Sequence, residues 1–274
     1  MPFNEMQIIK SIGSKKNFGV SGTKNFDYNS IARVSDNDKT IGYITMSKNS
    51  NKKDLKIDDE NHIIEPLLNL GEERQAIIIS GESGSGKSLL ASMLIKQYKK
   101  SYQENQVYLI SEKPKNIDRN FQNIDFMHQF TKEEIENFEL LNYTNSLFVI
   151  DDCDYSTDIK KIYNILNNIA ILGREMGISF AFVTHINSNL SAGAIYKEFR
   201  VYYTYSDNLI NNRMLFQNMG FSNKEIDYFI SLESSFYCFS RIYNTLLYDG
   251  GAMKYRNLDE KINKSSKRSK KQEE

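Results

Sequence analysis

The sequence predicts an α/β protein built on a doubly wound, mostly parallel sheet, and three observations lead to this fold class. Short and almost wholly apolar runs recur along the middle of the chain, which is typical of strands buried on both faces of a parallel sheet. Segments with helical apolar spacing separate these runs, as in βαβ units. A glycine-rich turn lies between the first such strand and the first helix.

The expected elements follow one another in strand and helix order. Strands are expected at Ala76–Ser80, Val107–Ser111, Leu147–Ile150, Ile178–Val183 and Val201–Tyr205, with a last strand, at a sheet edge, at Phe236–Arg241. Helices are expected over Ser88–Lys99, after the capping box of Thr131 and Glu134, from Ile159 to Ala170, and over Asn223–Leu232, where Ser222 and Glu225 form a second capping box. Gly177 is expected to cap the third helix.

The pattern divides the chain into three parts. Residues 1–70 are predicted to hold a loosely ordered arm, residues 1–35, and a small β element with strands at Ile41–Met46 and Leu55–Ile57. Pro66 predicts an extended connection into the main domain, residues 71–255. Residues 256–274 form a basic tail, which we interpret as a disordered, solvated end, with contact to nucleic acid as the alternative.

Composition excludes several classes of protein. The formal net charge is +0, which argues against a strongly basic polymer binder. No apolar run approaches the roughly 20 residues that cross a bilayer, so no membrane partner is expected. Cys153 and Cys238 are too few for a disulfide framework or a zinc cluster, and Met1–Lys10 lacks the features of a signal peptide. An intracellular location is therefore predicted.

The glycine-rich turn carries the most specific motif of the chain. It matches the phosphate-binding pattern G-x-x-x-x-G-K-[ST] at each of its residues, which are Gly81, Glu82, Ser83, Gly84, Ser85, Gly86, Lys87 and Ser88. Glycines let the backbone N–H groups converge on phosphate oxygens, and the following helix points its positive end at the same anion. Lys87 would reach the β- and γ-phosphates, and the Ser88 hydroxyl would ligate magnesium. The loop therefore predicts binding of ATP, or of a close relative such as GTP, with Mg²⁺.

The strand Leu147–Ile150 runs into two carboxylates, Asp151 and Asp152, which is the form of a Walker B strand. Asp151 is predicted to hold the magnesium ion, directly or through water. Asp152 stands where many such ATPases have a glutamate that orients and deprotonates the attacking water. An aspartate that ends a strand or caps a helix is the alternative for either residue.

Two further residues are candidates for the γ-phosphate side of the site. The strand Ile178–Val183 is predicted to lie between the strand before the loop and the strand of Asp151, so that Thr184 or His185 at its end would sense phosphate or the attacking water. A histidine bonded to the backbone is the alternative. Arg174 is placed in the last turn of the preceding helix, where it would complete a neighbouring subunit's site or merely favour the helix dipole.

Together these segments resemble the FtsK–HerA-type genome packaging ATPases of poxviruses and giant DNA viruses, over roughly residues 75–205. The motifs that carry the resemblance are Gly81–Ser88, Leu147–Asp152, Gly173-Arg174 and Ile178–His185. The resemblance implies a ring of identical subunits that pumps double-stranded DNA into a capsid, located in the host cytoplasm, a viral factory or the virion. It also implies that Lys87 and Ser88 bind phosphate and magnesium, and that His185 stands where a polar sensor, often glutamine, is found.

Two features depart from that family. Arg174 is followed by Glu175 where the family commonly has an Arg-His pair, and residues 1–70 match no known pattern. Two other functions stay open. A nucleotide or small-molecule kinase would need an arginine-bearing lid, and no arginine cluster suited to one is evident. A nucleotide-dependent scaffold protein is compatible with Asp152 in place of glutamate.

Overall fold

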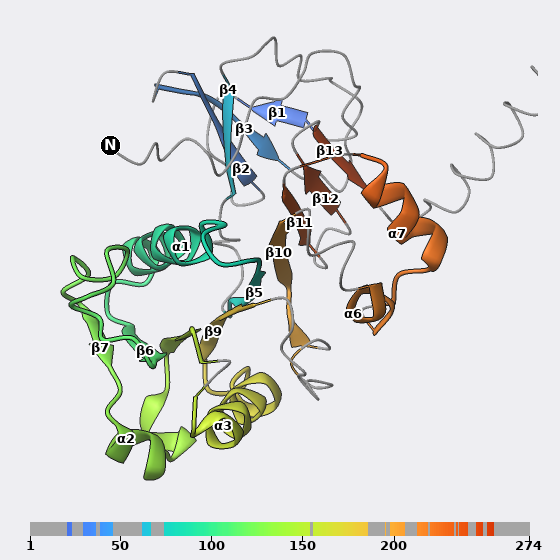
Figure 1. Ribbon diagram of the computed structural model, residues 1–274. Helices are drawn as coiled ribbons and strands as arrows, with labels where there is room; N and C mark the ends of the chain where they lie inside the picture. Colours follow the sequence, from blue (N-terminus) through green and yellow to red (C-terminus); the bar gives the residue numbers. More distant parts are fainter. Residues whose placement is uncertain are drawn as a thin grey trace, which may run out of the picture.

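The computed structural model describes residues 21–23, 30–36, 39–45, 62–66, 74–153, 156–185, 195, 198–205, 213–218, 220–232, 234, 236–240, 245–248 and 251–254. These residues form two sheets and the helices that pack on them (Figure 1). The strand predicted at Leu55–Ile57 and the basic tail, residues 256–274, lie outside the described residues.

The larger sheet is mixed, with a parallel centre and an antiparallel extension. Its strands are β5 (Ala76–Ser80), β6 (Gln106–Ser111), β7 (Met127–Gln129), β8 (Ser146–Asp151), β9 (Ser179–Thr184), β10 (Val201–Tyr205), β11 (Phe236–Ser240), β12 (Thr245–Tyr248) and β13 (Gly251–Lys254). Their order is β13-β12-β11-β10-β5-β9-β8-β6-β7. Pairing is parallel from β10 to β7 and antiparallel from β10 to β13. The strand β9 therefore lies between β5 and β8.

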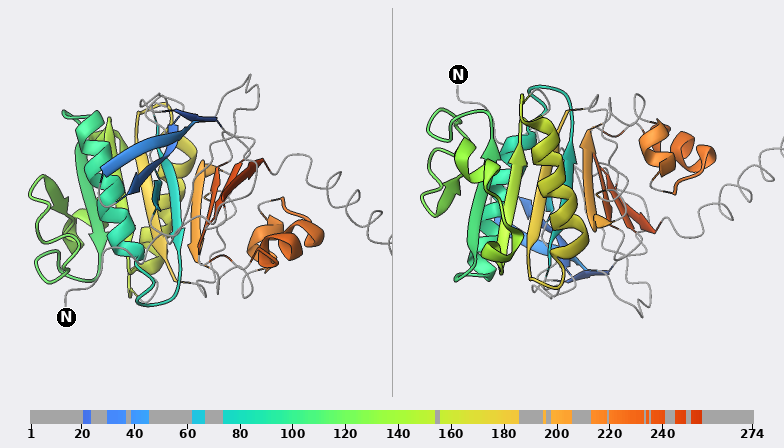
Figure 2. Two further views of the ribbon diagram at one scale, coloured as in Figure 1. Left: turned by 90° about the horizontal axis from the view of Figure 1, so that it is seen from above. Right: turned by 90° about the horizontal axis from the view of Figure 1, so that it is seen from below.

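Helices cover both faces of the parallel centre. The helix α1 (Lys87–Ser101) lies on one face and α3 (Ile159–Leu172) on the other, as the two views of Figure 2 show. Shorter elements follow β7 and β10, and these are α2 (Lys132–Glu136), the 3-10 helix η2 (Leu140–Tyr143), α6 (Arg213–Asn218) and α7 (Asn223–Ile230). The doubly wound arrangement predicted from alternating strands and helices is confirmed.

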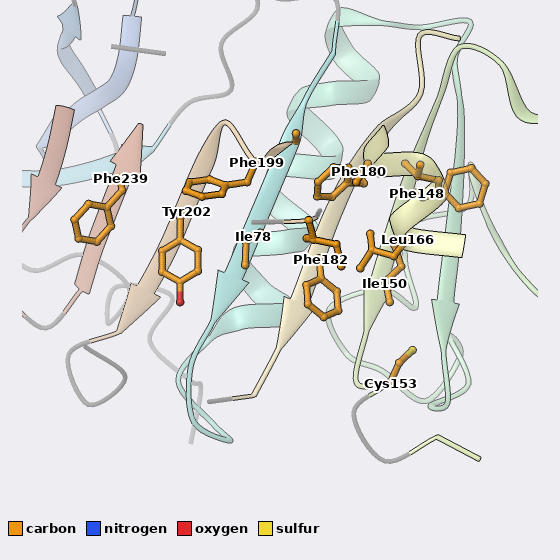
Figure 3. Packing of buried hydrophobic residues seen from close by; sticks show 14 of the residues in the cluster. Ile78, Phe148, Ile150, Cys153, Leu166, Phe180, Phe182, Phe199, Tyr202 and Phe239 are labelled. Atoms are coloured by element: carbon orange, nitrogen blue, oxygen red, sulfur yellow. The ribbon is translucent and has the colours of Figure 1, made fainter. Parts of the chain in front are cut away.

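Alternating side chains of β5 explain why this strand is apolar throughout. Ile77 and Ile79 belong to the buried cluster that contains Leu90 and Leu94 of α1. Ala76 and Ile78 belong to the second cluster, on the α3 side. Figure 3 shows part of this second cluster, in which Ile78, Phe180, Phe182 and Phe148 lie along neighbouring strands beside Leu166 of α3. A strand that packs on both faces must be apolar at successive positions, and this makes it recognisable in the sequence.

Most predicted element boundaries agree with the structure. The strands at Ala76–Ser80 and Val201–Tyr205 have the predicted bounds. The strand β6 differs from prediction by one residue at its start, and β8 and β9 differ by one residue at both ends. Both predicted capping boxes are present, at Thr131 with Glu134 and at Ser222 with Glu225.

The predicted end of the third helix is wrong. The helix α3 ends at Leu172, and its C-cap is Gly173 rather than Gly177. Gly177 has a φ of 67° and lies in the turn that leads into β9. Glycine with a left-handed backbone is common both in helix caps and in turns, so the sequence could not show that Gly177 lies in a turn after the helix.

The two ends of the chain contain more strand than was predicted. The strand β11 is not at the sheet edge, since β12 and β13 extend the sheet beyond it. Near the N-terminus a separate four-stranded sheet has the order β1-β3-β2-β4, from β1 (Ser21–Thr23), β2 (Ser30–Asp36), β3 (Lys39–Thr45) and β4 (His62–Pro66). Thus β1 and β2 lie in the segment predicted to be a loose arm, and Pro66 ends a strand. Ala32 of β2 is buried in the same cluster as the residues of α1.

Candidate nucleotide-binding site

The candidate site lies at one edge of the larger sheet, because the parallel strands all end there. The loop Gly81–Ser88 follows β5 directly, Asp151 is the last residue of β8, and Thr184 is the last residue of β9. The backbone N–H of Gly81 donates to the carbonyl oxygen of Thr184 over 3.3 Å, so the loop begins against β9. Ligands of open parallel sheets bind at this carboxyl edge.

The loop has the backbone shape that its glycines permit. Gly86, which caps α1, has a φ of 97°, a conformation that is costly for residues with a side chain. Gly81 is required for a different reason, since a Cβ atom there would lie 2.4 Å from Ser85 Oγ and 2.7 Å from Tyr205 Cδ2. The Lys87 side chain is buried and folds back over the loop, where its Nζ donates to the carbonyl oxygen of Glu82 over 2.9 Å.

The structure brings Ser88 and Asp151 together across 63 residues of sequence. The Ser88 hydroxyl donates to Asp151 Oδ2 over 3.0 Å. Asp151 is 1% exposed, and its Oδ1 has no hydrogen-bond partner among the described residues. Burial, together with the neighbouring charge of Asp152, raises the pKa of Asp151 to about 7, although the bond from Ser88 acts in the opposite direction.

These two side chains fit a magnesium ion. Both offer hard oxygen ligands, and Mg²⁺ is commonly held by one or two such protein ligands together with phosphate oxygens and water. A buried carboxylate oxygen without a donor is costly in the protein alone, and a divalent cation would offset that cost. Asp151 and Ser88 are therefore suited to the role that the sequence predicts for them.

Asp152 and His185 meet at the ends of β8 and β9. Asp152 has a φ of 52°, and its Oδ1 lies 3.2 Å from His185 Nε2. Both side chains are partly exposed, at 38% and 25%. The Thr184 side chain is buried, and its hydroxyl donates to the carbonyl oxygen of His185 over 3.2 Å. Of the two residues predicted as sensors, His185 thus has the more exposed polar group.

Arg174 lies away from the loop of its own chain. The helix α3 begins after β8 at the carboxyl edge and returns the chain to the opposite edge, where β9 begins at Ser179. Arg174 is exposed in the turn after α3, not in its last helical turn as predicted. At this edge its charge acts on Arg74, whose Nη2 donates to the carbonyl oxygens of Ile169 and Ala170 over 2.7 and 3.0 Å. The structure therefore does not bring Arg174 together with the other candidate residues.

Two polar residues near the loop, Tyr205 and Glu112, were not predicted as site residues, whereas Ser85 was predicted as part of the loop. Ser85 Oγ and Tyr205 Oη are both buried and have no hydrogen-bond partner among the described residues, and both side chains are close to Gly81. Glu112 follows the last residue of β6, and its Oε1 accepts a short hydrogen bond from the Ser156 hydroxyl. The position of Glu112 directly after a predicted strand was a usable signal, because parallel strands end at one edge.

A comparison with protein families gives one match. Residues 60–153 match the model of the Novel STAND NTPase 3 family. The matched segment contains Gly81–Ser88, Asp151 and Asp152, whereas His185 lies outside it, so the chain is similar to this NTPase family over part of the candidate site. No curated protein matches the sequence.

The comparison with solved structures gives neighbours of low sequence identity. The genome packaging NTPase B204 of Sulfolobus turreted icosahedral virus 2, in complex with AMP, has a TM-score of 0.45 and 12% identity over 65% of this chain and 97% of that chain. The DNA-packaging ATPase B204 from Sulfolobus Turreted Icosahedral Virus has a TM-score of 0.44 and 14% identity over 63% and 95%. EssC (ATPases 2 and 3) from Geobacillus thermodenitrificans has a TM-score of 0.40 and 12% identity over 71% of this chain and 39% of that chain.

The helices of the described residues were also compared with the dimensions of a bilayer. None of them combines the length and the apolar character needed to span a membrane.

Proposed function

We propose that the protein binds ATP with Mg²⁺ at the loop Gly81–Ser88 and hydrolyses its terminal phosphate. The contact between Ser88 and Asp151 carries this proposal, because it joins the end of a phosphate-binding loop to a buried carboxylate. The second oxygen of that carboxylate, Oδ1, has no hydrogen-bond partner among the described residues and could bind a cation. In a glycine and serine turn that binds no ligand, the burial of the Asp151 carboxylate would be left without compensation. The match of residues 60–153 to an NTPase family model supports the same function.

Each candidate residue has a role in this reaction. The backbone N–H groups of the loop and the N-terminus of α1 bind the phosphates, and Lys87 neutralises the β- and γ-phosphates. Ser88 and Asp151 hold Mg²⁺, which when bound offsets the negative charge of the phosphate oxygens. Asp152, held by His185 at 3.2 Å, orients the attacking water, and His185 senses the γ-phosphate.

We further infer that hydrolysis drives movement of double-stranded DNA by a ring of identical subunits. The motifs that resemble FtsK–HerA-type packaging ATPases support this finer function, as does the basic segment Lys261–Lys271 with its six positive side chains. In such a ring Arg174 would act on the ATP of a neighbouring subunit, because it lies at the edge of the sheet opposite its own loop. The main domain in this proposal is residues 71–255.

Steady-state ATP hydrolysis with and without double-stranded DNA tests both levels of the proposal. Wild-type turnover should rise several-fold with DNA, and the Lys87→Ala variant should lose hydrolysis by about 100-fold or more in either condition. Lys96→Ala, on the outer part of α1, serves as the matched control and should hydrolyse ATP like the wild type. Hydrolysis that DNA does not change would contradict the motor but not the ATPase, and binding without hydrolysis would favour a scaffold protein.

A further inference from the structure

A third carboxylate, that of Glu112, lies at the same edge of the sheet as Asp151 and Asp152. The strands β6 and β8 pair in parallel, and Ser111 of β6 is in register with Asp151 of β8. The next residue on each strand is Glu112 and Asp152, so both leave the sheet at the same level. Two acidic side chains thus follow directly from neighbouring strands, beside the residue proposed to hold magnesium.

The Glu112 side chain is held in place by the segment that follows β8. The Ser156 hydroxyl lies within a short hydrogen bond of Glu112 Oε1, and Ser156 is buried. The backbone N–H of Asp158 donates to Ser156 Oγ over 3.0 Å. The hydroxyl has one proton to donate, so Ser156 accepts from Asp158 and donates to Glu112, which accepts as a carboxylate. One oxygen of Glu112 is therefore anchored by a residue near the start of α3.

No ion pair within the described part of the chain neutralises Glu112. Its sequence neighbour Lys113 pairs instead with Asp118, over 3.1 Å. Glu112 itself is exposed, so its second oxygen is open to a water molecule. A fixed carboxylate that faces solvent and has no cationic partner is suited to accept a proton.

Asp152 is placed differently from Glu112. It has a left-handed backbone conformation, with a φ of 52°, and its Oδ1 lies 3.2 Å from His185 Nε2 at the end of β9. This contact draws the shorter carboxylate towards β9, whereas Glu112 lies on the opposite side of β8. Asp151 is therefore flanked by carboxylates on both sides, and only Asp152 is already bonded to a histidine.

From this placement we propose that Glu112 is the general base of ATP hydrolysis and that Asp152 with His185 only orients the water. The inference rests on the proposed ATPase function. The Glu112 carboxylate takes a proton from water while the water oxygen forms a bond to the γ-phosphorus, and the bond from that phosphorus to the β,γ-bridging oxygen breaks with its electron pair on ADP. The proton then passes from Glu112 to the inorganic phosphate or to solvent. Ser156 is a positioning residue that keeps Glu112 in place.

The test separates nucleotide binding from hydrolysis in variants of the full chain. Glu112→Gln should bind ATP with Mg²⁺ within about threefold of the wild type, yet its single-turnover hydrolysis should fall by about 100-fold or more. Asp152→Asn should lose only about tenfold, since it retains a side-chain oxygen for water or His185. Ser156→Ala should lose less than Glu112→Gln, with unchanged binding. Glu104→Gln, which is exposed at the other end of β6, is the control and should match the wild type.

Three outcomes would overturn the assignment. Glu112→Gln that hydrolyses ATP at the wild-type rate would exclude Glu112 as the base. Loss of hydrolysis in Asp152→Asn with retention in Glu112→Gln would return the role to Asp152. Wild-type protein that binds ATP without hydrolysing it would overturn both this assignment and the proposed function, whereas the first two outcomes leave the ATPase function intact. If Glu112→Gln does not fold, Glu112→Asp replaces it and should keep binding but lose at least tenfold in hydrolysis.

Discussion

Each of the two edges of the parallel sheet has a buried charged side chain, and the two side chains differ in how fully the protein satisfies their hydrogen bonds. At the edge where β5 begins, Arg74 is 4% exposed and donates two hydrogen bonds to the last turn of α3. Burial lowers the pKa of Arg74 to about 10, so it remains a cation at neutral pH. At the other edge burial raises the pKa of Asp151 to about 7, and one of its oxygens has no partner among the described residues.

From this difference we infer that the charge of Arg74 stabilises the fold, whereas the charge of Asp151 is available to bind a ligand. The helix α3 has no basic residue in its own last turn, and Arg74 supplies the cation that its C-terminal carbonyls favour. Its guanidinium also lies 5.6 Å from the centre of the Phe180 ring, a cation–π contact. Asp151 receives one hydrogen bond from Ser88, which leaves its burial incompletely compensated by the protein. Substitution should therefore affect activity at one edge and stability at the other.

Asp151→Asn should give the largest effect of this comparison. ATP hydrolysis should fall by about 100-fold or more, because a neutral amide is a poor ligand for Mg²⁺. The variant should melt no lower than the wild type when both are measured with EDTA, because the amide oxygen still accepts from Ser88 and the cost of a buried charge is removed. Asp125→Asn, an exposed residue, is the control for the substitution itself. A variant that melts several degrees lower would show that Asp151 serves the fold.

Arg74→Met should give the reverse result, with an effect of about 2 kcal/mol on the free energy of unfolding. The substitution leaves the buried carbonyl oxygens of Ile169 and Ala170 without their donor, although methionine retains much of the packing against Phe180. Urea unfolding measures the loss, and Arg74→Lys should recover part of it because the charge is kept. The folded Arg74→Met protein should bind ATP like the wild type, since Arg74 lies at the edge opposite the loop. If the fully folded Arg74→Met protein bound ATP more weakly than the wild type, the inference that Arg74 stabilises the fold without affecting the nucleotide site would be wrong.

The residues of the nucleotide-binding edge could be predicted from the sequence, whereas the contacts of Arg74 at the opposite edge could not. The loop and the strand β5 were predicted residue by residue, because phosphate binding requires particular residues at fixed spacing and a strand packed on both faces is apolar throughout. Asp151 was predicted because it ends such a strand. The partners of Arg74 lie 95 and 96 residues away, and no local pattern connects them. The same holds for Glu112 and Ser156, whose contact depends on the register of β6 with β8 and on the path of the chain after Asp152.

Several short strands were not predicted, in the parallel part of the larger sheet as well as in antiparallel segments. The parallel strand β7, of three residues, was missed, whereas the antiparallel strand β11 was predicted. The strands β1, β12 and β13 have only three or four residues each, and the seven-residue strand β2 contains polar and charged residues such as Arg33 and Asp36. Three or four residues are too few for a period to be recognised, and polar residues weaken the apolar pattern of a longer strand. The prediction of a loose arm was wrong at the positions of β1 and β2. Gly177 illustrates a different limit, since its left-handed conformation serves a turn that lies four residues beyond the true cap at Gly173.

Arg174→Ala should have the smallest effect on the isolated chain, and it tests whether the Arg74 edge has any function beyond the fold. Arg174 is exposed and its charge acts unfavourably on Arg74, so its loss should change the free energy of unfolding by less than about 0.5 kcal/mol. If the proposed ring brings this edge against a neighbour's loop, hydrolysis per subunit should rise with protein concentration in the wild type and stay low in the variant. Equal rates for both proteins at concentrations where sedimentation shows a full ring would exclude Arg174 from the neighbouring site. The edge of Arg74 would then serve the fold alone, and an arginine acting between subunits would have to come from another part of the chain.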